Sequence, residues 1–123
     1  MNRLRVNPAL DLPPSRQLVE AVLDGVASGA LAPGARLLSV RALAAEALVN
    51  PNTVAKAYRE LELMGVVEPR NGLGVFVGVR GPEIARGARR DATIEAFRRA
   101  AAEALRAGHP LGTLQSMLKG ESK

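Results

Sequence analysis

Hydrophobic residues recur at intervals of three and four positions in three stretches of the first half of the chain. This spacing puts them on one face of a helix and predicts helices over residues 14–28, 40–48 and 51–64. Ser39 and Asn50 stand directly before the second and third stretches, where their side chains can accept hydrogen bonds from the free amides of a first turn. The second and third helices are therefore predicted to follow each other with almost no loop, as in a helix-turn-helix unit.

A strand pattern follows the third predicted helix. Two runs rich in valine, at residues 66–68 and 75–79, flank a turn that contains Gly72 and Gly74, which is typical of a β-hairpin. The segment 36–38 is a candidate for a further short strand beside this hairpin. A three-helix unit followed by such a hairpin is a winged helix-turn-helix, in which the hairpin is the wing.

The two ends of the chain lie outside this unit. Residues 1–13 are rich in proline and are predicted to form an extended arm, with alternating residues at 4–7 that could form a short edge strand. Helical spacing returns near residue 83 and is expected to stop at the Gly-His-Pro sequence of 108–110. A short last helix is predicted over 111–118.

These elements predict a mainly α fold with a small β-hairpin wing. We assign the winged helix-turn-helix domain to residues 1–80 and a C-terminal two-helix dimerisation region to residues 81–123. Two helices of this size can bury their apolar stripes against a second copy of the chain, and the alternative is that they fold back on their own winged domain as a monomer. The predicted dimerisation face consists of Ile94, Phe97, Ala101, Leu105, Leu111, Leu114 and Leu118.

Composition narrows the classes of function. The 123 residues carry a net charge of +5, which favours a polyanionic partner, although an arginine-rich proteome would give the same balance. There is no cysteine, so disulfides, thiolate metal sites and cysteine nucleophiles are excluded. No stretch approaches the ~20 apolar residues of a membrane-spanning helix, and the N-terminal residues lack a signal-peptide pattern. We therefore expect a cytoplasmic protein without a membrane partner.

No group of residues has the pattern of a catalytic or metal site. His109 is the single histidine and stands in a turn without a nearby carboxylate cluster, while Glu60 and Glu62 have the spacing of a solvated helix face. The glycines at 72 and 74 do not precede a helix within a strand-helix-strand unit, which disfavours a nucleotide-phosphate loop. We expect no enzymatic activity, no cofactor and no bound metal.

The polar face of the helix at 51–64 suits a DNA major groove. Asn52 and Thr53 place short polar groups at its start, and Lys56 adds a cation further along. Arg41 lies in the first turn of the preceding helix, where a cation opposes the helix dipole unless a phosphate or a guanine completes the charge balance. The alternative is an ordinary solvated amphipathic helix next to a surface arginine.

Six short motifs match the sequence pattern of a known family in their order and spacing. They lie at residues 28–37, 39–44, 50–54, 57–61, 65–67 and 72–77. With these motifs, the chain resembles the DNA-binding domain of the GntR family of bacterial transcriptional regulators. It departs from the family pattern at Leu38, where proline is usual, and at Ala55, where some relatives carry a basic residue.

The resemblance implies a set of DNA contacts on the second and third helices and on the wing. The implied contacts are Arg41, Asn50, Asn52, Thr53 and Lys56 on the helices, and Arg70, Asn71, Gly72 and Gly74 on the wing. The short tail resembles that of the YtrA-like subfamily, in which the tail dimerises. The implied function is a homodimeric repressor on an inverted-repeat operator in double-stranded DNA, and a small-molecule effector stays open.

Two other functions remain open at this point. The chain could be a sequence-tolerant architectural DNA-binding protein, or a winged module that docks a partner. The arginine-rich tail could itself bind nucleic acid or an acidic membrane surface. Residues 81–123 hold eight basic and five acidic side chains. Because the two kinds interleave, ion pairing within or between helices is the better interpretation.

Overall fold

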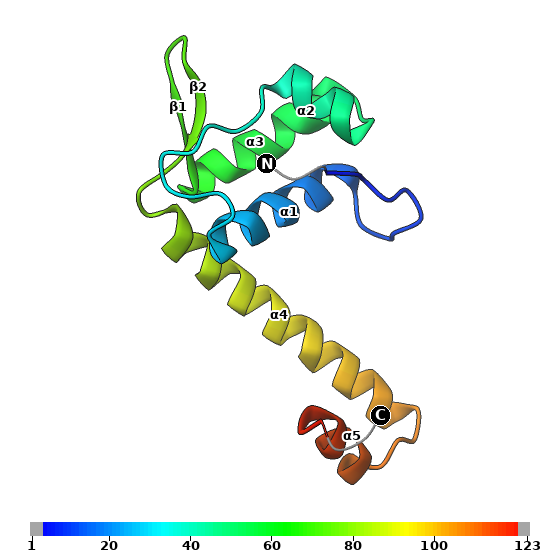
Figure 1. Ribbon diagram of the computed structural model, residues 1–123. Coiled ribbons are helices and arrows are strands. Elements are labelled where there is room, and N and C mark those ends of the chain that lie inside the picture. Colours follow the sequence, from blue (N-terminus) through cyan, green and yellow to red (C-terminus); the bar gives the residue numbers. More distant parts are fainter. Residues whose placement is uncertain (1–3, 121–123) are drawn as a thin grey trace. The chain divides into compact units, whose positions relative to one another are not determined.

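The computed structural model describes residues 4–120 (Figure 1). Its elements, in chain order, are α1 (Pro14–Ser28), α2 (Val40–Ala47), α3 (Pro51–Met64), β1 (Val67–Arg70), β2 (Gly74–Val77), α4 (Gly81–Arg106) and α5 (Leu111–Leu118). The predicted mainly α fold with a two-stranded hairpin is confirmed. The chain divides into two compact units, Met1–Arg89 and Arg90–Lys123, and α4 contributes to both. The assignment of domains at 1–80 and 81–123 stays a prediction.

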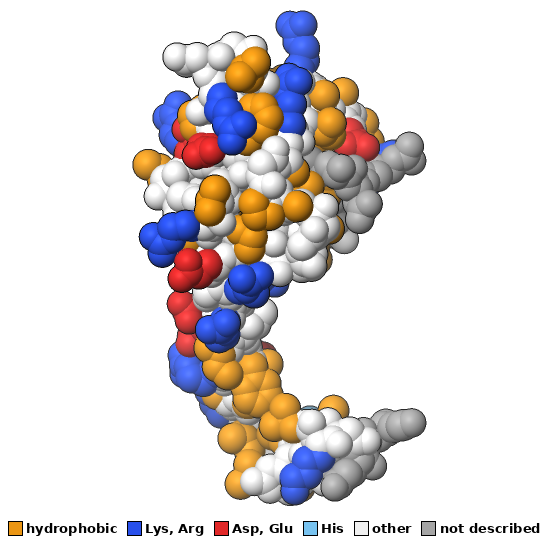
Figure 2. All heavy atoms as spheres, turned by 60° about the vertical axis from the view of Figure 1, so that its left-hand side comes forward, with side chains coloured by type: hydrophobic (Ala, Val, Ile, Leu, Met, Phe, Trp, Pro, Cys, Tyr) orange, Lys and Arg blue, Asp and Glu red, His pale blue; other side chains and the backbone are white. Residues whose placement is uncertain are grey.

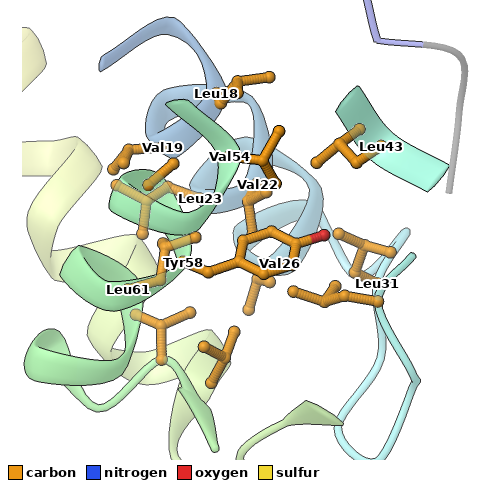
Figure 3. Packing of buried hydrophobic residues seen from close by; sticks show 14 of the residues in the cluster. Leu18, Val19, Val22, Leu23, Val26, Leu31, Leu43, Val54, Tyr58 and Leu61 are labelled. Carbon is orange, nitrogen blue, oxygen red and sulfur yellow. The ribbon is translucent and has the colours of Figure 1, made fainter. Parts of the chain in front are cut away.

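The core of the first unit consists of leucine, valine and alanine side chains with one tyrosine. The positions predicted to face inward on α1 are all buried: Leu18, Val19, Val22, Leu23 and Val26. On α3 the buried residues are Val54, Ala57, Tyr58 and Leu61. Figure 3 shows the Tyr58 ring among the aliphatic side chains of α1 and α3. Burial of each large apolar side chain contributes about 1.5–3 kcal/mol, so this contact fixes which face of α3 points outward.

Side-chain caps define where α2 and α3 begin. The Ser39 hydroxyl accepts a hydrogen bond from the amide of Ala42 at 3.1 Å, and Asn50 Oδ1 accepts one from the amide of Asn52 at 2.8 Å. Both caps were predicted and both are confirmed. Between the two helices the chain turns at Leu48, which has left-handed backbone angles (φ 59°, ψ 48°) and is 73% exposed.

The wing is an antiparallel pair in which Val67 lies opposite Val77 and Arg70 lies opposite Gly74. The predicted turn is therefore shorter than expected, because β1 continues through Pro69 to Arg70. Pro69 fits in β1 because this strand lies at the edge of the sheet, where an amide donor is not needed. The predicted strand at 36–38 is reduced to one bridge, Arg36 to Phe76, beside which the Leu37 amide donates to the Val75 carbonyl at 2.9 Å.

The N-terminal arm does not form the edge strand that the alternation at 4–7 suggested, since the described residues 4–13 contain no strand. Gln17 provides the physical reason. Its side chain accepts a hydrogen bond from the Asn7 amide and donates to the carbonyls of Asn7 and Leu12, each at 2.9 Å. The arm is thus held against the start of α1 by one side chain instead of by strand pairing.

The first part of α4 belongs to the core of the first unit. Helix α4 begins at Gly81, two residues earlier than predicted, and a Cβ at Gly81 would lie 2.7 Å from the Val66 carbonyl oxygen, so only glycine fits. Ile84 and Ala88 pack against the buried core. These two residues therefore serve the winged domain, and neither belongs to the predicted dimerisation face, which begins at Ile94.

The second unit contains the rest of α4, a turn at Gly108 and α5. Its exposed apolar side chains include Ile94, Phe97, Leu105, Leu111, Met117 and Leu118. On the same helix, Glu95 pairs with Arg98 at 2.6 Å and with Arg99 at 3.3 Å. The hydrogen bond from Arg98 lowers the pKa of Glu95. These three charged residues of α4 therefore pair with each other, as the interleaved pattern indicated.

Replacing Leu48 with glycine should stabilise the first unit. A residue with a side chain pays about 1–2 kcal/mol for left-handed backbone angles, and glycine does not. Glycine instead loses more backbone entropy on folding, which costs less. The net gain should be a few tenths to about 1 kcal/mol. Leu63, also exposed but helical, is the matched control, and Leu63→Gly should lose about 0.5–1 kcal/mol. Urea unfolding measures both. Equal destabilisation by the two variants would contradict the strain at Leu48.

Replacing Tyr58 with phenylalanine should lower stability and change its pH dependence. The Tyr58 hydroxyl donates to the Leu38 carbonyl at 2.7 Å, so Tyr58→Phe leaves that acceptor unpaired and should cost about 1 kcal/mol at neutral pH. Burial raises the pKa of Tyr58 from 10.0 to about 12. The hydroxyl's contribution is therefore complete below pH 10 and is lost as the pH rises through about 12.

Urea unfolding of both proteins between pH 9 and 12 measures this difference. The wild type should lose up to about 2–3 kcal/mol more than Tyr58→Phe over that interval. Parallel curves for the two proteins would show that the hydroxyl is not held neutral in the folded state.

Candidate nucleic-acid interface

The first two turns of α3 present a polar surface directly opposite the buried stripe. Asn52 and Lys56 are exposed and Thr53 is half-buried. Val54 and Ala57, on the opposite side of the helix, face the core. The start of α3 is fixed by the Asn50 cap, so Asn50 is already engaged through its carbonyl oxygen. A helix end that carries short polar groups and one cation can reach base edges in a major groove.

Arg41 belongs to the first turn of α2 and is exposed. Neither Arg41 nor Lys56 forms an ion pair with a residue in the described part of the chain. Ser39 and Leu38 hold this end of α2 through the cap and through the Tyr58 hydrogen bond. The Arg41 guanidinium and the Lys56 ammonium group are therefore available to an outside anion. The two hydrogen bonds fix the backbone at the start of α2, which carries Arg41.

The wing carries the remaining four predicted contacts. Asn71 and Gly72 are exposed at its tip. The Arg70 guanidinium lies 4.3 Å from the centre of the Phe76 ring and also pairs with Glu68 at 3.1 Å. Arg70 is thus partly neutralised by contacts within the wing, which reduces what it can offer to an anion outside.

One arginine near this surface was absent from the predicted set. Arg36 is exposed and bridges Phe76, and its side chain lies against Gly74, which has a φ of +118°. The signal was present in the sequence as the alternation of Ala35, Arg36 and Leu37 in a segment predicted as a strand. The polar member of such a trio points away from the core when its neighbours point inward.

The predicted dimerisation residues form an apolar surface on the second unit, where Figure 2 shows hydrophobic side chains gathered. A groove of about 300 Å³ lies between α4 and α5 and is lined by Phe97, Ala100, Ala101, Ala104, Leu114, Met117 and Leu118. Four predicted residues line this groove. Ile94, Leu105 and Leu111 are exposed outside it, and the groove also includes Ala100, Ala104 and Met117, which were not in the predicted set.

The described residues hold no group of three or more histidine, cysteine, aspartate or glutamate side chains able to bind a metal ion. Among the same residues, no helix has the length and apolar character needed to span a membrane.

Part of the chain matches a known protein family. The family model described as bacterial regulatory proteins, gntR family, matches residues 12–77. The HTH-type transcriptional regulator Rv1152 of Mycobacterium tuberculosis is 50% identical over 74 residues, which cover 60% of this chain and 61% of that protein. The HTH-type transcriptional repressor YtrA of Bacillus subtilis is 36% identical over 74 residues, which cover 60% of this chain and 57% of that protein.

The chain thus matches about three fifths of the length of these two relatives. A solved structure of a GntR family transcriptional regulator from Listeria monocytogenes has a TM-score of 0.77 with this chain, covers 93% of it and 97% of its own length, and is 24% identical. At that identity the likeness supports the fold alone. Because the family model covers more than half of the residues, this chain belongs to the GntR family of bacterial regulatory proteins.

Proposed function

We propose that the protein is a sequence-specific DNA-binding transcriptional regulator that acts as a homodimeric repressor on an inverted-repeat operator. The observation that carries the proposal is the exposed polar start of α3, capped by Asn50 and backed by a fully buried stripe. Membership of a family of regulatory proteins supports it. The name of the Bacillus subtilis relative, a transcriptional repressor, supports repression as the sign of regulation.

In this mechanism the first turns of α3 enter a major groove end-first. Asn52 and Thr53 discriminate bases, because amide and hydroxyl groups match donors and acceptors on base edges. Lys56 and the wing hold phosphates, which supply most of the affinity and make it dependent on salt. Arg41, which has no ion-pair partner among the described residues, adds a base or phosphate contact from α2.

Dimerisation of the second unit would pair two such surfaces. The groove between α4 and α5 is apolar, and the exposed side chains around it include Phe97, Leu111 and Leu118. Large exposed apolar surfaces of this kind favour association with another protein surface. Two recognition helices should then reach successive major grooves about 34 Å apart, or a multiple of that distance. A cytoplasmic location and the absence of enzymatic activity are parts of the same proposal.

The second candidate is a sequence-tolerant architectural binder, favoured by the excess of positive charge on the chain. Competition with random DNA at moderate salt separates the two functions. A specific regulator should retain a preference of ~10³-fold or more for its operator, whereas an architectural binder should be displaced by random DNA.

Replacing Arg41 with alanine should weaken operator binding by about 10- to 100-fold, because one guanidinium contact to DNA is lost. The dimer and the melting temperature should stay nearly unchanged, since Arg41 is exposed and its helix is capped by Ser39. Fluorescence anisotropy with labelled operator measures the affinity. Arg86→Ala, at an exposed arginine of α4, is the matched control and should bind normally. Normal affinity of Arg41→Ala would remove Arg41 from the interface.

Replacing Phe97 with arginine should split the dimer, because it puts a charge into the lining of the apolar groove at a cost of roughly 2 kcal/mol or more. Sedimentation velocity should show a monomer, and binding to the full palindrome should fall towards the affinity for one half-site. Leu63→Arg, at an exposed leucine of the first unit, is the control and should remain dimeric. An intact dimer for Phe97→Arg would rule out this interface.

A further inference from the structure

We propose that Arg36 is a DNA-phosphate contact and that Gly74 exists in the wing to make room for it. This inference rests on the proposed function, because it adds a contact to the same DNA-binding surface. Arg36 is not among the contacts that the family resemblance implies.

The strand register puts Arg36 on the same face of the wing as the predicted contacts. Phe76 lies opposite Arg36 on one side and opposite Glu68 on the other, and Gly74 lies opposite Arg70. Residues directly opposite one another in an antiparallel pair share a face, and so do residues two apart along one strand. These five residues therefore form one face of a small three-segment sheet.

That face is the outer one, because the alternate residues point into the core. Val67 and Val77 are buried, and so is Leu37 in the neighbouring segment. Val75, between Gly74 and Phe76, packs against the same core. The side chains of the opposite set are thus left on the surface beside the wing tip, where a DNA backbone would pass a winged helix-turn-helix domain.

Gly74 lets the Arg36 side chain lie across the strand. A Cβ added at Gly74 would come within 2.9 Å of Arg36 Nε, closer than such contacts allow, and would also be strained at a φ of +118°. The guanidinium therefore occupies the place of a missing side chain. Resting on the backbone limits the freedom of this long side chain, so less entropy is lost when it binds a phosphate.

The pairing of charges on this face distinguishes the two arginines. Arg70 has two partners within the wing, the Glu68 carboxylate and the Phe76 ring. Arg36 forms no ion pair with any residue in the described range 4–120 and is exposed. A planar guanidinium with no carboxylate partner matches the geometry of a phosphodiester, which can accept two parallel hydrogen bonds from it. Of the two arginines that the structure describes on this face, Arg36 is thus the one without a carboxylate partner.

The test is the salt dependence of DNA binding by Arg36→Gln. Operator and random DNA should both be bound about tenfold more weakly at moderate salt, because a phosphate contact carries no sequence information. The slope of log affinity against log salt should become shallower by about 0.9, the value for one phosphate released. Arg86→Gln, at an exposed arginine outside the wing, is the matched control and should keep the wild-type slope.

Gly74→Ala provides a second variant, which keeps the charge of Arg36 but moves its side chain. Its Cβ must displace the guanidinium, so it should reproduce the shallower slope of Arg36→Gln, and the double variant should add little to either. Melting temperatures confirm that the variants remain folded. Unchanged affinity and slope for Arg36→Gln, with specific binding by the wild type, would overturn this inference and leave the proposed function standing. Failure of the wild type to bind any DNA would overturn both.

Discussion

The arrangement of the DNA-binding surface depends on one contact, the packing of Tyr58 of α3 against α1. The ring fills a core otherwise built from aliphatic side chains, and its hydroxyl donates to the Leu38 carbonyl just before α2. One residue thus holds the outward face of α3, the start of α2 and the segment that carries Arg36. Because a buried hydroxyl without its acceptor is costly, these three parts are expected to keep one relative position.

Positive charge on the first unit is divided between structural and available groups. Arg89 pairs with Asp24 at 2.6 Å, Arg16 pairs with Glu60, and Arg70 is engaged within the wing. Arg41 and Lys56 form no ion pair in the described part of the chain. A cationic side chain that is paired with a carboxylate contributes little to binding an outside anion. The positions of the unpaired cationic side chains therefore indicate the partner better than the net charge of the chain does.

The helices were predictable because the signals for them are local. Stripe spacing, the Ser39 and Asn50 caps and the glycine stops act within a few residues, so the bounds of α1, α2 and α3 agree with the expectation almost residue by residue. The missed features depend on contacts between distant segments. Gln17 replaces strand pairing in the arm, and Arg36 gains its place from Gly74, 38 positions later. The alternation at 35–37 indicates that Arg36 faces outward, but no local pattern reports its contact with Gly74. The roles of the predicted DNA contacts stay predictions.

The most direct test of the account is hydroxyl-radical footprinting of the wild-type protein on the DNA just upstream of its own gene, with the stoichiometry measured in parallel. We expect two protected stretches of equal size with centres about 34 Å apart or a multiple of that distance, and two chains bound per site. A single undivided stretch, or protection spread evenly along the DNA, would contradict a paired, sequence-reading surface built on α3 and the wing.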